Sequence, residues 1–165
     1  KAEQGLIEIE KNTKIKFIII RSPAIYGIGA PGNFRLIEKL IKYNLPIPLN
    51  SITNKKSMIY IDNLIDFILK VIKMDDTIKQ KIFLVSDCKD LSTPEIIKVV
   101  AKINNKKPNL YNFNLSLLSF IFKIIGHQKA WESLSSNLQI SNNDLKKNLG
   151  WEPPFNPKSY LNTYD

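Results

Sequence analysis

The sequence has 165 residues, of which 44% are hydrophobic and 24% charged, a composition typical of a soluble globular domain and not of a disordered or fibrous chain. The formal net charge is +9, but all but two of the 24 basic residues are lysine and they are scattered along the chain. This argues against a dedicated nucleic-acid-binding face, because readers of phosphates and grooves favour arginine. Cys88 is the only cysteine, which excludes an internal disulfide and favours a reducing cytoplasm.

In the first part of the chain, residues 2–11 have the pattern of an amphipathic helix, with Leu6 and Ile7 expected to face inward. Residues 15–20 are an apolar run rich in isoleucine, as in a strand buried on both faces of a parallel sheet. Pro23 lacks an N–H group, so strand pairing should end near Ser22. A glycine-rich loop follows, and the spacing of the next apolar residues predicts a helix that begins near Asn33, with Asn33 suited to be its N-cap.

Beyond that helix, the prolines at 46 and 48 predict an extended segment over residues 45–49. Strands are expected at 57–61 and 82–85, with a shorter one at 110–113. Helices are expected at 64–74 (capped by Asp62), at 93–103 (begun by a Ser92/Glu95 capping box), at 115–125 and at 142–149. The segment 115–125 is too short to span a bilayer. Strands that alternate with helices predict an α/β fold.

The glycine loop fits the pattern G-x-G-x-x-G at Gly27, Gly29 and Gly32, which is the dinucleotide-binding fingerprint when its first glycine directly follows a strand. Here six residues separate Gly27 from the predicted strand, and Pro31 removes an amide that the phosphates would need. We therefore reject a phosphate-binding fingerprint at this loop.

Six short motifs occur in a characteristic order. They are Arg21-Ser-Pro-Ala-Ile-Tyr-Gly-Ile-Gly, Gly32-Asn-Phe, Leu45-Pro-Ile-Pro-Leu, Lys56-Ser-Met-Ile-Tyr-Ile-Asp-Asn-Leu, Leu91-Ser-Thr-Pro-Glu and Leu149-Gly-Trp-Glu-Pro-Pro. Together they resemble the C-terminal half of an extended short-chain dehydrogenase/reductase of the NAD-dependent epimerase/dehydratase family. The resemblance implies a Rossmann-like α/β fold, with residues 1–44 ending the Rossmann-like part and residues 45–165 forming mostly the substrate-binding lobe.

The resemblance also assigns candidate site residues. Ser22, Pro23 and Ala24 match positions beside the nicotinamide of NAD, and Ala24 also faces the sugar. Asn33 matches a position that binds the sugar diphosphate, and Lys56 matches an arginine that commonly clamps it, although a solvated surface lysine is the alternative for Lys56. The segment along the nucleotide base corresponds to Leu45, Pro46, Ile47, Pro48 and Leu49. No metal site is expected.

The family's catalytic Tyr-x-x-x-Lys motif is absent, since none of the six tyrosines has lysine four residues later. The glycine-rich NAD fingerprint of the family's first strand is absent as well. The chain also begins in the middle of a helical pattern without a cap or a methionine. We therefore expect a catalytically inactive piece of a longer protein, whose N-terminal half binds most of the NAD. The expected partners are a nucleotide sugar and that half, with a homodimer possible for the intact protein.

The preferred reading is a cytoplasmic nucleotide-sugar epimerase, specifically a UDP-hexose 4-epimerase of surface polysaccharide synthesis. A dehydratase or reductase of the same family stays open, because the residues that separate these activities lie mostly upstream. A basic nucleic-acid-binding module is the alternative from another class, and it predicts clustered lysines and steeply salt-dependent binding. A non-catalytic interaction domain on the same fold is also open.

Overall fold

The computed structural model describes residues 2–27, 29–30, 32–74 and 82–157. Their helices and strands, in chain order, are α1 (Ala2–Asn12), β1 (Ile19–Arg21), β2 (Ile25–Tyr26), α2 (Asn33–Lys42), β3 (Ile59–Tyr60), α3 (Ile61–Lys73), β4 (Ile82–Leu84), α4 (Thr93–Ile103), α5 (Leu115–Ile124), α6 (Gln128–Ser135) and α7 (Asn143–Leu149).

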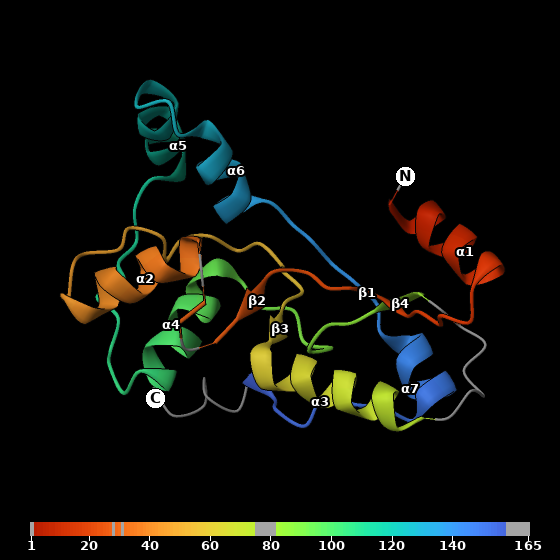
Figure 1. The fold of residues 1–165 in the computed structure, drawn as a ribbon. Helices are drawn as coiled ribbons and strands as arrows, with labels where there is room; N and C mark the ends of the chain where they lie inside the picture. The colour runs from red at the N-terminus through yellow and green to blue at the C-terminus, as the bar shows by residue number, and fades with distance from the viewer. Residues whose placement is uncertain (1, 28, 31, 75–81, 158–165) are drawn as a thin grey trace.

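The strands form two short parallel pairs. β1 pairs with β4, with Ile19 opposite Ile82, and β2 pairs with β3, with Tyr26 opposite Tyr60. Parallel neighbours need a crossover connection, and here the chain passes through α2 and α3 before β4 completes the first pair (Figure 1). The α/β class with parallel strands, expected for the late part of a Rossmann-like fold, is therefore confirmed.

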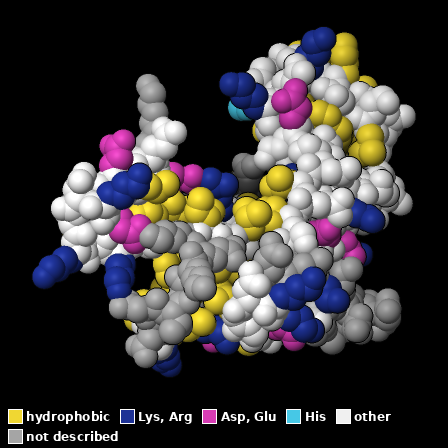
Figure 2. All heavy atoms as spheres, turned by 90° about the vertical axis from the view of Figure 1, so that its right-hand side faces the viewer, with side chains coloured by type: hydrophobic (Ala, Val, Ile, Leu, Met, Phe, Trp, Pro, Cys, Tyr) yellow, Lys and Arg dark blue, Asp and Glu magenta, His cyan; other side chains and the backbone are white. Residues whose placement is uncertain are grey.

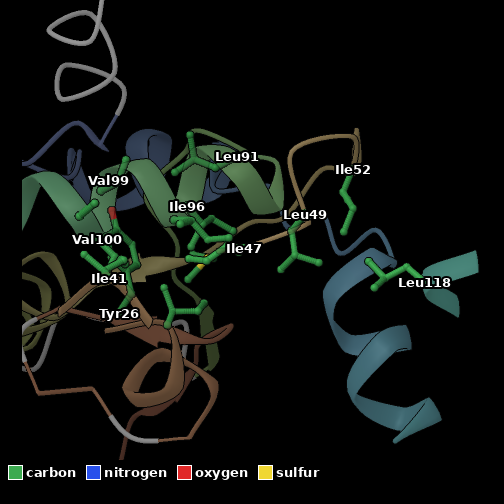
Figure 3. Packing of buried hydrophobic residues seen from close by; sticks show 14 residues of the cluster. Tyr26, Ile41, Ile47, Leu49, Ile52, Leu91, Ile96, Val99, Val100 and Leu118 are labelled. Atoms are coloured by element: carbon green, nitrogen blue, oxygen red, sulfur yellow. The ribbon is translucent and has the colours of Figure 1, made fainter. Parts of the chain in front are cut away.

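Two clusters of buried side chains hold these elements together. The larger cluster joins α2, the segment that contains Ile47, and α4; Figure 3 shows Ile41 of α2 beside Val100 of α4 and Tyr26 below them. The smaller cluster packs α3 against β4 and the segment after α7, with the ring of Phe67 meeting those of Phe83 and Trp151 edge-on at 5.7 and 5.0 Å. The first cluster fixes the segments that line the candidate site.

The local signals predicted some helix ends correctly and missed others. The capping box of α4 is confirmed, with the Ser92 hydroxyl accepting from the backbone N–H of Glu95 while the Glu95 carboxylate accepts from the backbone of Ser92. Gly150 ends α7 in the left-handed conformation at φ 56°. The prediction for Asp62 is wrong: α3 begins at Ile61, so Asp62 lies inside the first turn and Tyr60 occupies the cap position.

The strands are shorter than the apolar runs suggested. Pairing of β1 starts at Ile19 rather than at Ile15, whose side chain is 60% exposed. The predicted strands at 57–61 and 110–113 are reduced to the two residues of β3 and to a single bridge between Leu110 and Ile47. Pairing length depends on the partner strand and not on the apolar run alone.

α1 forms where the sequence predicted it, but its apolar residues do not face inward. Leu6, Ile7 and Ile9 are exposed. Two hydrogen bonds from the Arg21 guanidinium to the Glu3 carboxylate link α1 to β1, and this ion pair lowers the pKa of Glu3. An exposed apolar helix face normally packs against a neighbouring layer, and the described residues leave the apolar face of α1 uncovered.

Candidate functional site

A cavity of about 110 Å³ lies beyond the carboxyl end of β1. Residues from five separate parts of the chain line it: Ala24, Phe34, Ile37, Lys56, Ser57, Met58, Thr93, Ile96, Ser133, Leu134 and Leu138. We call it the Ala24–Lys56 cavity. Its walls are mostly apolar, and the lysine is the cationic residue among those lining residues. Ligands of open α/β sheets bind beyond the carboxyl ends of the strands, so the position suits a ligand site.

The backbone holds Lys56 in place from two sides. Its N–H donates to the carbonyl of Leu91 at 2.9 Å and its carbonyl accepts from Leu91 at 3.0 Å, while the next residue, Ser57, donates to the carbonyl of Leu138 at 2.6 Å. The lysine is thus fixed between the start of α4 and the chain after α6.

The Lys56 side chain is half-buried, and its Nζ donates to the carbonyl of Ser133 at 2.5 Å. Burial lowers the pKa of this ammonium, because desolvation disfavours the charged form. An ammonium has three donors, so after the bond to Ser133 two remain to reach an anion. The environment differs from that of a solvated surface lysine, which was the alternative for this residue.

Of the three residues that follow β1, one lines the cavity. Ala24 does so, and its carbonyl accepts from the backbone of Ile59 at 3.2 Å, which ties the turn to β3. Ser22 is exposed and Pro23 is half-buried, and neither lines this cavity. Pro23 follows the last paired residue closely, as its missing N–H predicted.

Asn33 is the first residue of α2, but the N-cap position belongs to Gly32, at φ 70°. The N-cap prediction for Asn33 is therefore wrong by one residue. The Asn33 side chain lies outside the described part of the structure, so a diphosphate contact stays a prediction. The next residue, Phe34, lines the cavity and places this helix start beside it.

The extended segment predicted along the nucleotide base is only partly present: Ile47 forms a bridge to Leu110, but Pro48 and Leu49 lie in a turn. None of its residues lines the Ala24–Lys56 cavity. Ile47 and Leu49 are buried in the core, and the backbone of Ile47 bonds to Asn109 and Tyr111. Leu45 and Pro46 are exposed and Pro48 is half-buried. Contact with a base therefore stays a prediction, and the exposed members are the ones free to make it.

Sequence reasoning missed the polar centre behind the site. The carboxylate of Asp87, 2% exposed, accepts hydrogen bonds from the Tyr26 hydroxyl at 2.7 Å, from Asn63 Nδ2 at 2.7 Å and from the backbone of Tyr60 at 3.0 Å. Burial raises the pKa of Asp87, and the three hydrogen bonds oppose that shift. The carboxylate thus joins β2, β3 and α3. Its one sequence signal is an acidic residue two positions after the predicted strand 82–85, separated from it by Ser86.

A second buried amide connects the cavity wall to α6. Asn54 Nδ2 donates to the carbonyls of Leu134 and Ser136 at 3.0 and 2.9 Å, and its Oδ1 accepts from the backbone of Thr93 at 2.9 Å. The Thr93 hydroxyl donates to the carbonyl of Leu134 as well, at 2.5 Å. Two of the bonded residues, Thr93 and Leu134, line the cavity, so this network sets its width.

Other chemistries have little support in the described residues. Burial raises the pKa of the Cys88 thiol, which keeps it protonated and a poor nucleophile. Within the described ranges, no three His, Cys, Asp or Glu side chains gather closely enough to hold a metal ion. The described helices include none that is long and apolar enough to cross a membrane.

The sequence is similar to that of a known nucleotide-sugar epimerase. The chain is 32% identical to UDP-glucose 4-epimerase of Vibrio cholerae over 154 residues, which cover 93% of this chain and 47% of that protein. The chain therefore spans about half the length of this relative. No protein-family model matches the sequence.

Solved structures share the fold at lower identity. UDP-glucuronic acid 4-epimerase of Bacillus cereus, crystallised with NAD, superposes with a TM-score of 0.65 at 17% identity over 96% of this chain and 46% of its own. UDP-glucose 4-epimerase of Thermotoga maritima, crystallised with UDP-glucose, gives 0.62 at 14% identity over 96% of this chain and 48% of its own. The dTDP-4-dehydrorhamnose reductase of Bacillus anthracis, crystallised with NADP, gives 0.61 at 19% identity over 96% of this chain and 51% of its own.

Proposed function

We propose that this chain forms the sugar-nucleotide side of the active site of a nucleotide-sugar 4-epimerase. The premise is that it corresponds to the C-terminal half of a member of the NAD-dependent epimerase/dehydratase family of extended short-chain dehydrogenases/reductases. The preferred substrate is a UDP-hexose, in the cytoplasmic synthesis of surface polysaccharide. Residues 1–44 end the Rossmann-like part, and residues 45–165 form mostly the substrate lobe.

The observation that carries the proposal is the Ala24–Lys56 cavity. It brings together two residues from motifs that lie 32 positions apart in the sequence, and one of them is a half-buried ammonium with donors to spare. A diphosphate is the anion that such a lysine suits, because its bond to a charged oxygen is strengthened where water is partly excluded. The cavity is smaller than a typical ligand pocket, so a second half of the site must close over the rest of the substrate.

NAD would supply the uptake and return of a hydride. On this chain the residues suited to meet it are Ser22 and Ala24, both exposed just after β1. A small side chain at position 24 lets a flat ring approach the backbone closely, and the half-buried Pro23 between the two stiffens the turn. The acid/base pair of the reaction would come from the N-terminal half.

The test is a chimaera that joins the N-terminal half of the Vibrio cholerae relative to this chain. We expect it to bind NAD and to interconvert UDP-glucose and UDP-galactose. A folded, NAD-loaded chimaera that converts no nucleotide sugar would remove the epimerase proposal, and oxidation of a reduced cofactor by a 4-keto nucleotide sugar would instead favour the reductase alternative.

A further inference from the structure

The helix α5 presents an apolar face to solvent. Leu117, Phe120, Ile121, Ile124 and Ile125 are between 39% and 68% exposed, and their spacing of three and four residues places them along one side of the helix. On the other side, Leu118 is buried in the larger core cluster. The exposed face is therefore not a consequence of a loose helix.

The attachment of this helix to α6 supports the same conclusion. The ring of Phe122 contacts that of Trp131 with centroids 5.7 Å apart, and both residues pack against the core cluster. Figure 1 shows α5 and α6 together at the top of the molecule, on the side away from α1. Figure 2 shows hydrophobic side chains on this upper lobe together with basic and acidic side chains and the histidine.

The charged side chains of α5 and α6 are two lysines and one glutamate, Glu132, which is exposed on α6 and accepts a hydrogen bond from Gln128. Lys123 on α5 and Lys129 on α6 are exposed beside the apolar face. An apolar helix face flanked by lysines is the pattern of a helix that lies in the plane of an anionic membrane surface.

We propose that the exposed face of α5 docks this protein on an anionic lipid surface. The ten residues of α5 are about 15 Å long, half of what a bilayer core requires, so the helix lies on the membrane rather than across it. A second copy of the chain is a poorer occupant, because the contact would bring the lysines of two lobes together. α1, whose apolar residues are also exposed, lies on the side of the molecule away from this lobe (Figure 1).

Vesicle flotation of the 165-residue chain tests the proposal, since aggregated protein sinks while vesicle-bound protein rises. We expect flotation with vesicles that contain phosphatidylglycerol, weaker flotation with phosphatidylcholine alone, and weaker binding at high salt. F120E and I124E should each reduce partitioning by about tenfold or more, since each replaces an exposed apolar side chain that the membrane would bury. K123Q and K129Q should reduce it about fivefold each.

The matched control is I72E on α3, where an isoleucine is 72% exposed outside this face; it should float like the parent chain. Circular dichroism of each variant establishes that it is folded. Equal losses in I72E and I124E, or equal binding to neutral and anionic vesicles, would overturn the proposal. So would sedimentation in which F120E converts dimers to monomers while the parent binds no vesicles. None of these readouts requires a nucleotide sugar, so they are independent of the proposed function.

Discussion

Replacing Tyr26 by phenylalanine removes one hydrogen bond and leaves the packing in place. The Tyr26 hydroxyl donates to the Asp87 carboxylate at 2.7 Å, and the two residues are 1% and 2% exposed. The ring that remains still packs against Phe34 and Tyr60, at centroid distances of 6.4 and 5.4 Å. A hydrogen bond to a charged group stabilises by about 1.5–3 kcal/mol, so we expect Y26F to lower the free energy of unfolding by about that amount at neutral pH.

The pH dependence has a definite sign. Burial raises the pKa of Asp87 in the folded state, so the free energy of unfolding falls as the pH rises from the ordinary value of 3.8 through the folded-state pKa. The Tyr26 bond favours the ionised form and lowers this pKa. Y26F should therefore be most destabilising above the folded-state pKa of Asp87, and the effect should shrink as the pH falls through it.

Urea denaturation of the parent and of Y26F at several pH values measures this, with Y43F as the control because Tyr43 is exposed and its hydroxyl change should cost under about 0.5 kcal/mol. A loss in Y26F no larger than that in Y43F, or one that stays constant across the acidic range, would refute the assignment of Asp87 as the buried centre of this region.

Three further substitutions test the fold around the cavity. Gly27→Ala should destabilise by about 1–3 kcal/mol, because its φ is +150° and the added Cβ would lie 2.6 Å from Cγ2 of Ile61; an unchanged thermal midpoint would contradict this. S92A should cost about 1 kcal/mol through loss of the cap, measured by urea denaturation, with S92T expected to retain most of it. N54A should cost about 2–4 kcal/mol, because three buried hydrogen bonds are lost, and hydrogen exchange should rise over residues 134–136; exchange that stays slow there would speak against the network.

Local signals predicted most of the helices, because caps and apolar spacing act within a few residues of one another, although α6 and the caps of α2 and α3 were missed. Ser92 with Glu95, and Gly150 after α7, are examples in which the side chain or the backbone freedom needed is present in the sequence itself. The end of β1 near Pro23 belongs to the same class. These features depend on neighbours in the chain and not on the tertiary fold.

Features that depend on distant neighbours were not predictable in this way. The apolar residues of α1 would be inward only against a layer that the described residues do not provide, and the length of β1 depends on β4. The Asp87 centre joins side chains that are 24 and 61 positions away in the sequence. Single-sequence patterns carry no information on such contacts.

The candidate site falls between these cases. The family resemblance pointed to Ala24 and Lys56, and the fold brings both to one cavity. The same resemblance grouped residues 45–49 as a base-binding segment, but Ile47 and Leu49 are in the core. In that segment the alternation of exposed and buried residues, which the order of motifs does not reveal, separates side chains that pack from those available to a ligand.

The central claim is that this chain supplies the wall that binds the diphosphate. Its most direct test is the affinity of the NAD-loaded chimaera for UDP-glucose, measured by calorimetry. If Lys56 meets the diphosphate, K56Q should weaken binding about tenfold to a hundredfold, K56R should retain most of it, and K55Q at the exposed neighbouring lysine should have no effect. If both variants remain folded and K56Q binds UDP-glucose as tightly as K55Q does, the assignment of this wall to the substrate is contradicted.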